Sequence, residues 1–353
     1  MAHRATRSVE ELEEYLALVR AAGLDAPWSR PGPLIESKKT RVQPCIWRWA
    51  EIEPLLERSA EFVAPGQGTE RRILRLANPG VPERTSTHTL SVAVQYLLPG
   101  EVAPAHRHSP NALRFMLRGQ GAYTTVDGDK CLMEAGDLVL TPTPMLHDHG
   151  NEGNEPVIWF DGLDSPIVRY LEVLTQQRHP EDRQETGQVV GASERRFRAA
   201  GLRPATAAAA ARPGRLIHYR WQAAYAALRQ LAEVESDPFD DVILEYVDPA
   251  TGRPIFPTMA CYIQMIRPGV HTRAHRQTSS AVYHVVRGAG RTVIDGISHG
   301  WREGDFFAIP PLARHEHAND ETGPAILFSL QDVPLLKAVG LYREEEQACA
   351  FEP

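Results

Sequence analysis

From about residue 71 onward, short apolar stretches alternate with breaks made of glycine, proline and Asp-Gly pairs. Segments this short, bounded by turn-forming residues, are typical of β-strands rather than helices. The pair at 127–128 separates two such stretches and indicates a tight hairpin. Many short strands at this spacing predict an antiparallel barrel or sandwich.

Helical patterns lie outside these strand-rich blocks. Ser8 and Glu11 form a capping-box pair before apolar positions at helical spacing, and Gly23 is the expected end of that helix. The stretch VQPCIWRWAEIEPLLERS predicts a strand or loop followed by a short helix, and residues 219–233 predict another helix. Residues 173–215 are charged and then alanine-rich, which predicts a linker.

The strand-rich pattern occurs twice. His106 and His275 are 169 residues apart, as are Gly119 and Gly288, whereas His147 and His315 are 168 apart, so one deletion relates the two copies. The other paired positions are Pro99-Gly100 with Pro268-Gly269, Asp127-Gly128 with Asp295-Gly296, Gly136-Asp137 with Gly304-Asp305, and Asn151 with Asn319. A repeat of this length predicts two copies of one β-barrel domain.

The expected fold is therefore dominated by β-structure, with two antiparallel jelly-roll barrels, an N-terminal helical segment and a helical linker. The expected parts are a helical segment at 1–70, a first barrel with the active site at 71–172, a linker and helix at 173–235, and a second barrel with a degenerate site at 236–353.

Composition narrows the class of protein. Of 353 residues, 42% are hydrophobic and 24% charged, as in an ordinary soluble protein. The net charge is −7 without a basic patch, which argues against a nucleic-acid partner. Four cysteines without a C-x-x-C pair make no disulfide framework. The N-terminus is too charged for a signal peptide, and no apolar run approaches the roughly 18 residues of a membrane span. We expect a cytoplasmic protein without a membrane partner.

Two motifs resemble the cupin signatures. GDLVLTPTPMLHDHGN, residues 136–151, fits G-x5-P-x-G-x2-H-x3-N except that Pro144 replaces the second glycine, and GDFFAIPPLARHEHAN at 304–319 is its second copy. HRHSPNALRFMLRG supplies the H-x-H of the other signature, with Ala112 where many cupins have a glutamate ligand. The resemblance implies a metal site of three histidines without a carboxylate, namely His106, His108 and His147.

Within the cupins, the sequence resembles the gentisate 1,2-dioxygenase group. The similar stretches are WRWAE, ERRILRLANPG, PGEVAPAHRHSPNALRF, GAYTTVDGDKCLMEAGDLVLTP, HDHGN, WFDGLD and ATGRPIFPTMACYIQ, which cover most of residues 45–335. This resemblance implies a bicupin, Fe(II)-dependent enzyme that opens gentisate between its carboxyl-bearing and hydroxyl-bearing carbons to give maleylpyruvate. Members of the group also act on salicylate and 1-hydroxy-2-naphthoate.

The chemistry of the three histidines agrees with this resemblance. Residues two apart on a strand face one side, so His106 and His108 point into the barrel together. Three neutral imidazoles suit Fe(II), Mn(II) or Zn(II). They leave up to three positions of an octahedral metal for the carboxylate and ortho oxygen of an aromatic hydroxy acid and for O2. Ala112 leaves room for that chelate.

Arg114 and Gln95 are the expected substrate contacts. Arg114 lies at even spacing from the histidines, and a buried guanidinium needs an anionic partner, so it is the expected clamp on the substrate carboxylate; an internal salt bridge is the alternative. Gln95 shares a small, polar strand face with Ser91 and Ala93 and either bonds a ligand or is a satisfied core amide. Related enzymes often carry a larger, aromatic side chain at Ser91, so this departure enlarges the expected pocket.

Four further side chains complete the candidate site. His149 is expected to move a proton, because imidazole titrates near neutral pH, or else to hold another group by a hydrogen bond. Asp161 is expected to orient His149 or the third metal ligand, unless it is a plain turn residue. Arg71 and Arg72 resemble the family's arginines near the carboxylate pocket, and one of the two must point away.

The second copy keeps only part of the ligand set. His275 and His315 are present, but Gln277 replaces the middle histidine and Tyr283 replaces the arginine. We expect this barrel to be a structural or interface domain without a functional metal.

Other functions remain to be weighed against gentisate cleavage. The same chemistry on a substituted gentisate, a 5-substituted salicylate, salicylate or 1-hydroxy-2-naphthoate is one alternative. A non-catalytic cupin that binds an acid is another, although binding alone needs no open metal. Metal-dependent isomerases and hydrolases of this superfamily usually keep the glutamate that Ala112 replaces. A homo-oligomer, with a tetramer favoured, is expected from the family.

Overall fold

The computed structural model describes residues 8–30, 39–65, 71–199, 202, 204–206 and 214–346. The chain divides into two compact units, of which the larger spans residues 41–349. The smaller unit contains helix α1 (Val9–Ala21) and a short 3-10 turn at Pro27–Ser29. The Ser8 hydroxyl accepts a bond from the Glu11 backbone N–H, and the Glu11 carboxylate accepts one from the Ser8 N–H, which confirms the expected capping box.

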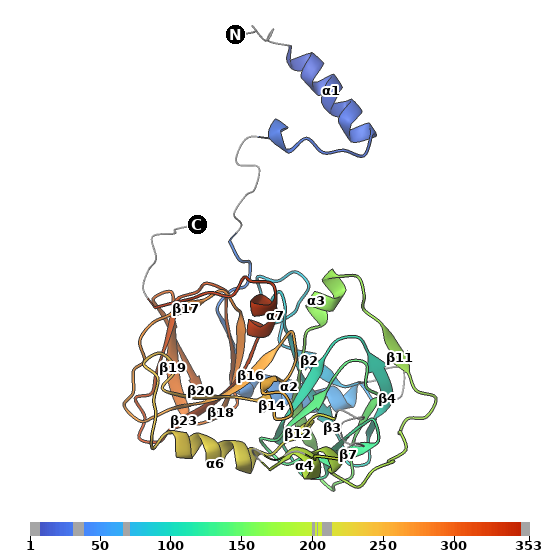
Figure 1. The fold of residues 1–353 in the computed structure, drawn as a ribbon, viewed down its shortest axis with the longest axis vertical. Helices are drawn as coiled ribbons and strands as arrows, with labels where there is room; N and C mark the ends of the chain where they lie inside the picture. Colours follow the sequence, from blue (N-terminus) through green and yellow to red (C-terminus); the bar gives the residue numbers. More distant parts are fainter. Residues whose placement is uncertain are drawn as a thin grey trace. The chain divides into compact units, whose positions relative to one another are not determined.

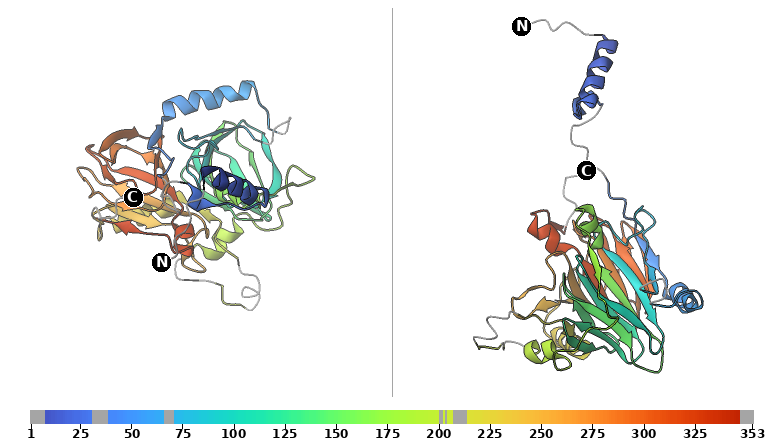
Figure 2. Two further views of the ribbon diagram at one scale, coloured as in Figure 1. Left: turned by 90° about the horizontal axis from the view of Figure 1, so that it is seen from above. Right: turned by 90° about the vertical axis from the view of Figure 1, so that its right-hand side faces the viewer.

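The larger unit holds two antiparallel β-barrels, which lie side by side in Figures 1 and 2. In the first barrel, a six-stranded sheet of order β12-β8-β5-β10-β3-β2 faces a five-stranded sheet of order β11-β4-β9-β6-β7. Its strands are β2 (Ile73–Arg75), β3 (Ser91–Leu97), β4 (Val102–His108), β5 (Ala112–Arg118), β6 (Ala122–Val126), β7 (Asp129–Leu132), β8 (Leu138–Thr141), β9 (His147–Asn151), β10 (Val157–Leu163), β11 (Gln176–Arg178) and β12 (His218–Tyr219).

The second barrel repeats this arrangement with a smaller second sheet. Its six-stranded sheet has the order β1-β21-β18-β23-β16-β13, and its three-stranded sheet the order β20-β19-β22. The strands are β1 (Cys45–Trp47), β13 (Val242–Glu245), β16 (Ala260–Ile266), β18 (Ala281–Arg287), β19 (Ala289–Ile294), β20 (Ile297–Arg302), β21 (Phe306–Ile309), β22 (His315–Ala318) and β23 (Ala325–Gln331), with the short pairs β14 (Val247–Asp248) to β15 (Arg253–Pro254) and β17 (Arg276–Gln277) to β24 (Glu344–Glu345).

The helices of the larger unit connect these sheets. They are α2 (Trp49–Arg58), α3 (Ser165–Tyr170), α4 (Ala192–Phe197), α6 (Trp221–Leu231) and α7 (Val333–Ala338), with a 3-10 turn at Ser59–Glu61. Helices α2 and α6 confirm the two helices expected from the sequence there. In the described part of the chain, no helix is both long and apolar enough to cross a membrane.

The segment that precedes each barrel pairs with the other barrel. Strand β1 joins the second barrel through β21, whereas helix α2, which follows directly, contacts β2 and β3 of the first. Likewise β12 joins the first barrel through β8, and α6 contacts β13 and β16 of the second. The expected linker is therefore partly built into the first barrel, where β11 also pairs with β4. Most of the alanine-rich run, at 207–213, lies outside the described residues.

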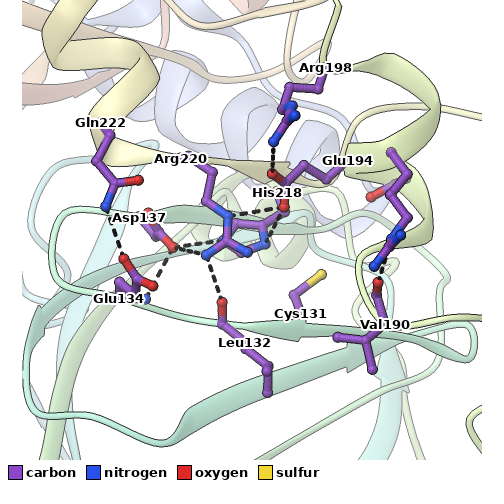
Figure 3. Close-up of polar contacts among 12 residues, drawn as sticks. Cys131, Leu132, Glu134, Asp137, Val190, Glu194, Arg198, His218, Arg220 and Gln222 are labelled. Carbon is purple, nitrogen blue, oxygen red and sulfur yellow. Dashed lines mark hydrogen bonds and ion pairs between the residues drawn. The ribbon is translucent and has the colours of Figure 1, made fainter.

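Two aspartates fix these exchanged segments, as Figure 3 shows for the first barrel. Asp137 accepts bonds from the Trp221 backbone N–H at 2.9 Å, from His218 Nε2 at 2.9 Å and from Arg220 at 3.1 Å. Asp305, its repeat partner, accepts bonds from the Trp49 N–H at 2.9 Å and Arg48 at 2.7 Å. The repeated Gly-Asp pair thus caps α6 in one copy and α2 in the other.

An aromatic cluster joins the outer faces of the two barrels. Phe115 and Phe160 of the first barrel contact Phe328 of the second, with ring centroids 4.5 and 5.6 Å apart. His284 lies within the same cluster, 4.5 Å from Phe306. Since both faces of the central strands are buried, one against the other barrel and one inside, β3 has no exposed residue.

Candidate active site

The three histidines expected to hold a metal converge inside the first barrel. His106 and His108 come from β4, and His147 comes from β9, which pairs with β4. One potential ligand atom from each lies within 4.8 Å of the other two. Ala112 is buried in the same barrel, on the strand that carries Arg114, and adds no carboxylate. Antiparallel pairing thus brings together residues that are about 40 positions apart in sequence.

Main-chain carbonyl groups orient these three imidazoles. Each Nδ1–H donates to a backbone oxygen, from His106 to Pro104 at 2.8 Å, from His108 to Pro110 at 2.8 Å and from His147 to Met145 at 2.9 Å. The tautomer that this requires leaves every Nε2 with a lone pair. The Nε2 atoms of His108 and His147 are buried without a hydrogen-bond partner, so the donor set fits a divalent metal ion.

Electrostatics keep the rings neutral. Burial, followed by the charge of Arg71, lowers the pKa of His106 to about 3 and that of His108 to about 4. Burial also holds the pKa of His147 well below its ordinary value. Since neutral imidazole is the form that ligates metals, no proton has to be displaced near neutral pH.

Arg114 is fully buried and faces the same interior. Its Nε lies 2.9 Å from Asp161 Oδ1, so the internal salt bridge that the sequence left open is present. Its Nη1 nevertheless has no hydrogen-bond partner. Burial lowers the pKa of Arg114 to about 10, while Asp161 acts in the opposite direction. A charged donor thus remains available to a ligand.

The adjacent arginines point in different directions. The Arg71 guanidinium lies 2.5 Å from His106 Nε2 and 3.8 Å from Asp161. Arg72 instead forms two 2.8 Å bonds to Glu101 and also donates to the Val63 carbonyl oxygen. The sequence predicted that one of the two points away and left open which; of the two candidate substrate contacts, Arg72 is the one whose guanidinium is engaged away from the histidines.

Strand β3 places three of the expected residues on one buried face. Gln95 is fully buried, and neither its Nε2 nor its Oε1 has a partner, so it is no satisfied core amide. Ala93 pairs with Asp161 across β10, and Ser91 pairs with Leu163. The small side chains of Ser91 and Ala93 therefore lie next to the part of β10 that contains Asp161.

His149 faces inward beside the metal-site histidines. Its ring centroid lies 5.4 Å from that of His147, and its Nδ1 contacts the Thr124 hydroxyl at 3.1 Å. Burial, with the charges of Arg114 and Arg71, lowers its pKa well below the ordinary value. The expected titration near neutral pH is thus wrong: His149 is held neutral. Asp161 contacts the arginines, and it is Thr124 that positions His149.

Trp159 is an inward residue that the sequence interpretation missed. It pairs with Gln95 across the sheet, and its ring lies 6.2 Å from His149 and 5.9 Å from the Arg114 guanidinium carbon. Its Nε1 is buried without a partner. Strand alternation could have found it, since Trp159 is two residues before Asp161 and so shares its face.

The interior collects buried polar atoms that lack partners. Buried polar groups in proteins are almost always hydrogen-bonded, so a cluster of exceptions indicates a place for a ligand, an ion or water. The cluster consists of Gln95 Nε2 and Oε1, His108 Nε2, Arg114 Nη1, His147 Nε2, His149 Nε2 and Trp159 Nε1.

Fold and site together define a bicupin in which, among the described residues, one group of three histidines could hold a metal ion. The Cupin domain family model matches residues 93–163 and 262–331, one region in each barrel. The chain is 38% identical to a 5-aminosalicylate 1,2-dioxygenase of Comamonas sp., over 88% of this chain and 84% of that protein. It is 36% identical to a gentisate 1,2-dioxygenase of Streptomyces sp., over 94% of each chain.

A solved structure gives the same relationship. Salicylate 1,2-dioxygenase from Pseudoaminobacter salicylatoxidans, in a crystal structure with gentisate, superimposes with a TM-score of 0.86 at 30% identity, over 99% of this chain and 97% of that one. The chain belongs to the gentisate and salicylate 1,2-dioxygenase family of ring-cleaving dioxygenases.

Proposed function

We propose that this enzyme uses Fe(II) at His106, His108 and His147 to open gentisate between its carboxyl-bearing and adjacent hydroxyl-bearing carbons, giving maleylpyruvate. The observation that best supports this function is that Arg114 Nη1 is buried without a hydrogen-bond partner, in the same barrel interior as three imidazoles that could bind a metal. When bound, the iron supplies a route by which O2 reacts with the aromatic ring. The remaining chemistry consists of binding, orientation and proton transfer by the chain itself.

Arg114 is the proposed partner of the substrate carboxylate. Asp161 holds its Nε side, so the guanidinium presents Nη1 to a ligand without side-chain rotation. A charge-assisted bond in a buried site is stronger than one in water and fixes the acid's orientation. Gln95 supplies an amide donor and acceptor for a further ligand oxygen.

Arg71 is proposed to exchange partners when the site fills. Its guanidinium lies against His106 Nε2, the atom that a metal needs. With a metal on that nitrogen, the guanidinium would lie elsewhere, and Asp161, 3.8 Å away, would keep it close to the site. There it adds positive charge that favours an anionic substrate.

His149 is proposed as the acceptor of the substrate's ortho-hydroxyl proton. The Thr124 hydroxyl donates to Met133 Sδ and therefore accepts from His149 Nδ1–H, so the lone pair is on Nε2, which is buried without a partner. A carboxylate bound at Arg114 offsets the positive charges that help to lower the pKa of His149, so the neutral imidazole can take a proton as the substrate binds and return it later.

A related candidate is the same reaction on a substituted ring. Ser91 and Ala93 leave the inward face of β3 small next to the strand that carries Asp161. Relatives include enzymes named for 5-aminosalicylate and 1-hydroxy-2-naphthoate as well as gentisate.

The family relationship disfavours a non-catalytic acid-binding cupin. We further propose that the first barrel, residues 71–172, carries the whole site and that the chains form a homotetramer.

The test is O2 uptake by Fe(II)-reconstituted protein mixed with gentisate, 5-aminosalicylate, salicylate or 1-hydroxy-2-naphthoate, with the ultraviolet band of the ring-fission product recorded in parallel. We expect one O2 per gentisate and no turnover in His108→Ala. The matched control is His271→Ala, because His271 is exposed and bonded to Asp320. Preference for another acid of the panel would reassign the substrate, and no uptake with any of them, despite bound iron, would refute the proposal.

A further inference from the structure

The second barrel repeats the histidine pair of the first with little change in geometry. The His275 N–H donates to the His315 carbonyl at 3.0 Å, and the His315 N–H donates to the His275 carbonyl at 2.8 Å. Their ring centroids lie 4.5 Å apart, compared with 4.4 Å for His106 and His147. His275 and His315 therefore keep the arrangement of His106 and His147, although Gln277 stands at the position of His108.

The two rings also keep the tautomer that a metal requires. His315 Nδ1 lies 3.1 Å from the Ala313 carbonyl oxygen, as His147 Nδ1 does from that of Met145. His275 Nδ1 lies 3.0 Å from Glu344 Oε1, and its Nε2 is buried without a partner. A carboxylate behind an imidazole, with the far nitrogen free, is the usual support of a metal-bound histidine.

The charges around this pair are opposite to those of the first barrel. Tyr283 occupies the register position of Arg114, opposite Ser329 rather than Asp161. Two carboxylates lie close by: Glu344 contacts His275, and Asp240 accepts a 3.1 Å bond from the inward-facing Gln264. The first interior thus attracts an anion beside its metal, whereas the second attracts a cation alone.

We propose that the second barrel binds a divalent transition-metal ion through the Nε2 atoms of His275 and His315, with Gln277 in the strand position of the third ligand. Gln277 Oε1 accepts a 2.8 Å bond from Ser279 Oγ and keeps a second lone pair for the ion. Imidazole nitrogens and an amide oxygen suit such ions, and water completes the coordination. This revises the expectation from sequence that the barrel lacks a metal, and it does not depend on the reaction proposed for the first. Without an arginine clamp, the ion has a structural role: it holds Glu344 of β24 against the barrel.

Metal titration of the full-length apoprotein tests the proposal. With Mn²⁺ as the probe, followed by electron paramagnetic resonance and isothermal titration calorimetry, we expect two ions per chain. His108→Ala should bind one ion, in the second barrel, and His315→Ala should also bind one, in the first. A wild-type stoichiometry of one, unchanged in His315→Ala and reduced to zero in His108→Ala, would overturn the proposal.

A milder variant covers the case in which His315→Ala fails to fold. Glu344→Gln, made in the His108→Ala background, should weaken the remaining Mn²⁺ site about 10- to 100-fold, as expected when the support of a ligand is removed. Glu316→Gln is the matched control, because Glu316 lies between His315 and His317 on β22 and faces the other side of the strand. Equal Mn²⁺ affinities of the two variants would contradict the role of Glu344.

Discussion

Arg114 and Asp161 form an ion pair, 2.9 Å from Nε to Oδ1, between side chains that are almost completely buried inside the first barrel. The two residues are register partners on β5 and β10, so the sheet itself sets their separation. One guanidinium nitrogen remains unpaired after this contact. Asp161 therefore orients the arginine without using up its capacity to bind an acid.

Arg114→Gln should impair both stability and catalysis. Breaking a buried ion pair costs about 3 to 5 kcal/mol, and the Arg71 guanidinium, 3.8 Å from Asp161, compensates the remaining carboxylate only in part. We expect a loss of that order in the free energy of unfolding, and a fall of at least about 100-fold in kcat/KM, equivalent to about 2.7 kcal/mol. Urea denaturation and steady-state O2 uptake measure the two effects, with iron content as the control.

A double variant separates these two effects. Arg114→Gln combined with Asp161→Asn should regain part of the stability, since the buried carboxylate that lost its closest partner is removed as well, but none of the activity. Recovery of turnover in the double variant would show that Arg114 acts only as the partner of Asp161.

Ser91→Trp should narrow the substrate range. A large side chain at Ser91 would add bulk to a buried strand face that Ser91 and Ala93 keep small. We expect kcat/KM for 1-hydroxy-2-naphthoate to fall at least about 10-fold more than that for gentisate, given the discrimination that an altered apolar pocket achieves. Ser91→Ala is the control and should leave the ratio unchanged. Equal losses on both acids would place Ser91 outside the substrate pocket.

Asp137 should contribute stability that depends on pH. Burial acts to raise the pKa of Asp137, but the bond and charge of His218 and the Trp221 N–H outweigh it, so the pKa is lowered. A lowered carboxyl pKa means that this stability is complete above about pH 4 and is lost as the pH falls through the folded-state value. Asp137→Asn should cost about 2 kcal/mol at pH 7.

Melting temperatures measured between pH 3 and 7 test this expectation. The Asp137→Asn curve should be flatter than that of the wild type at the acid end. Asp305→Asn is the matched variant, since Asp305 caps α2 in the second barrel as Asp137 caps α6. An Asp137→Asn curve parallel to the wild type would exclude a contribution of Asp137 to acid unfolding.

His284 should make the contact between the barrels sensitive to acid. Burial lowers its pKa to about 3, whereas the unfolded chain binds this proton near pH 6.5. Stability therefore falls as the pH drops from about 6.5 toward 3, by up to about 1.4 kcal/mol per pH unit from this group. His284→Phe keeps an aromatic ring and removes the titration.

Urea unfolding at pH 7 and pH 5 measures how much His284 contributes to the loss of stability at acid pH. Other buried histidines also titrate, so the difference in slope between variant and wild type is the informative quantity. We expect His284→Phe to lose about 2 kcal/mol less than the wild type over this interval. The same loss in both proteins would mean that His284 is already protonated or solvated in the folded state.

The sequence by itself determined the repeat, the barrels and the three histidines that converge in the first barrel. Asp127-Gly128 and Asp295-Gly296 both adopt positive φ at the hairpins where the sequence placed them. His106 and His108 share a face because strand alternation is a local property of the chain. Turn type and strand alternation can be predicted from a linear sequence, because they depend only on residues that are neighbours in the chain.

Only the tertiary structure decided which partners distant residues take. In the folded chain, Arg71 rather than Arg72 lies beside the histidines, and Asp161 contacts Arg114 rather than His149. Glu344 contacts His275 in the second barrel. It also placed β1 and β12 in the opposite barrels. These contacts depend on strand register and packing between segments far apart in the chain, and periodicity along a single segment carries no information about either.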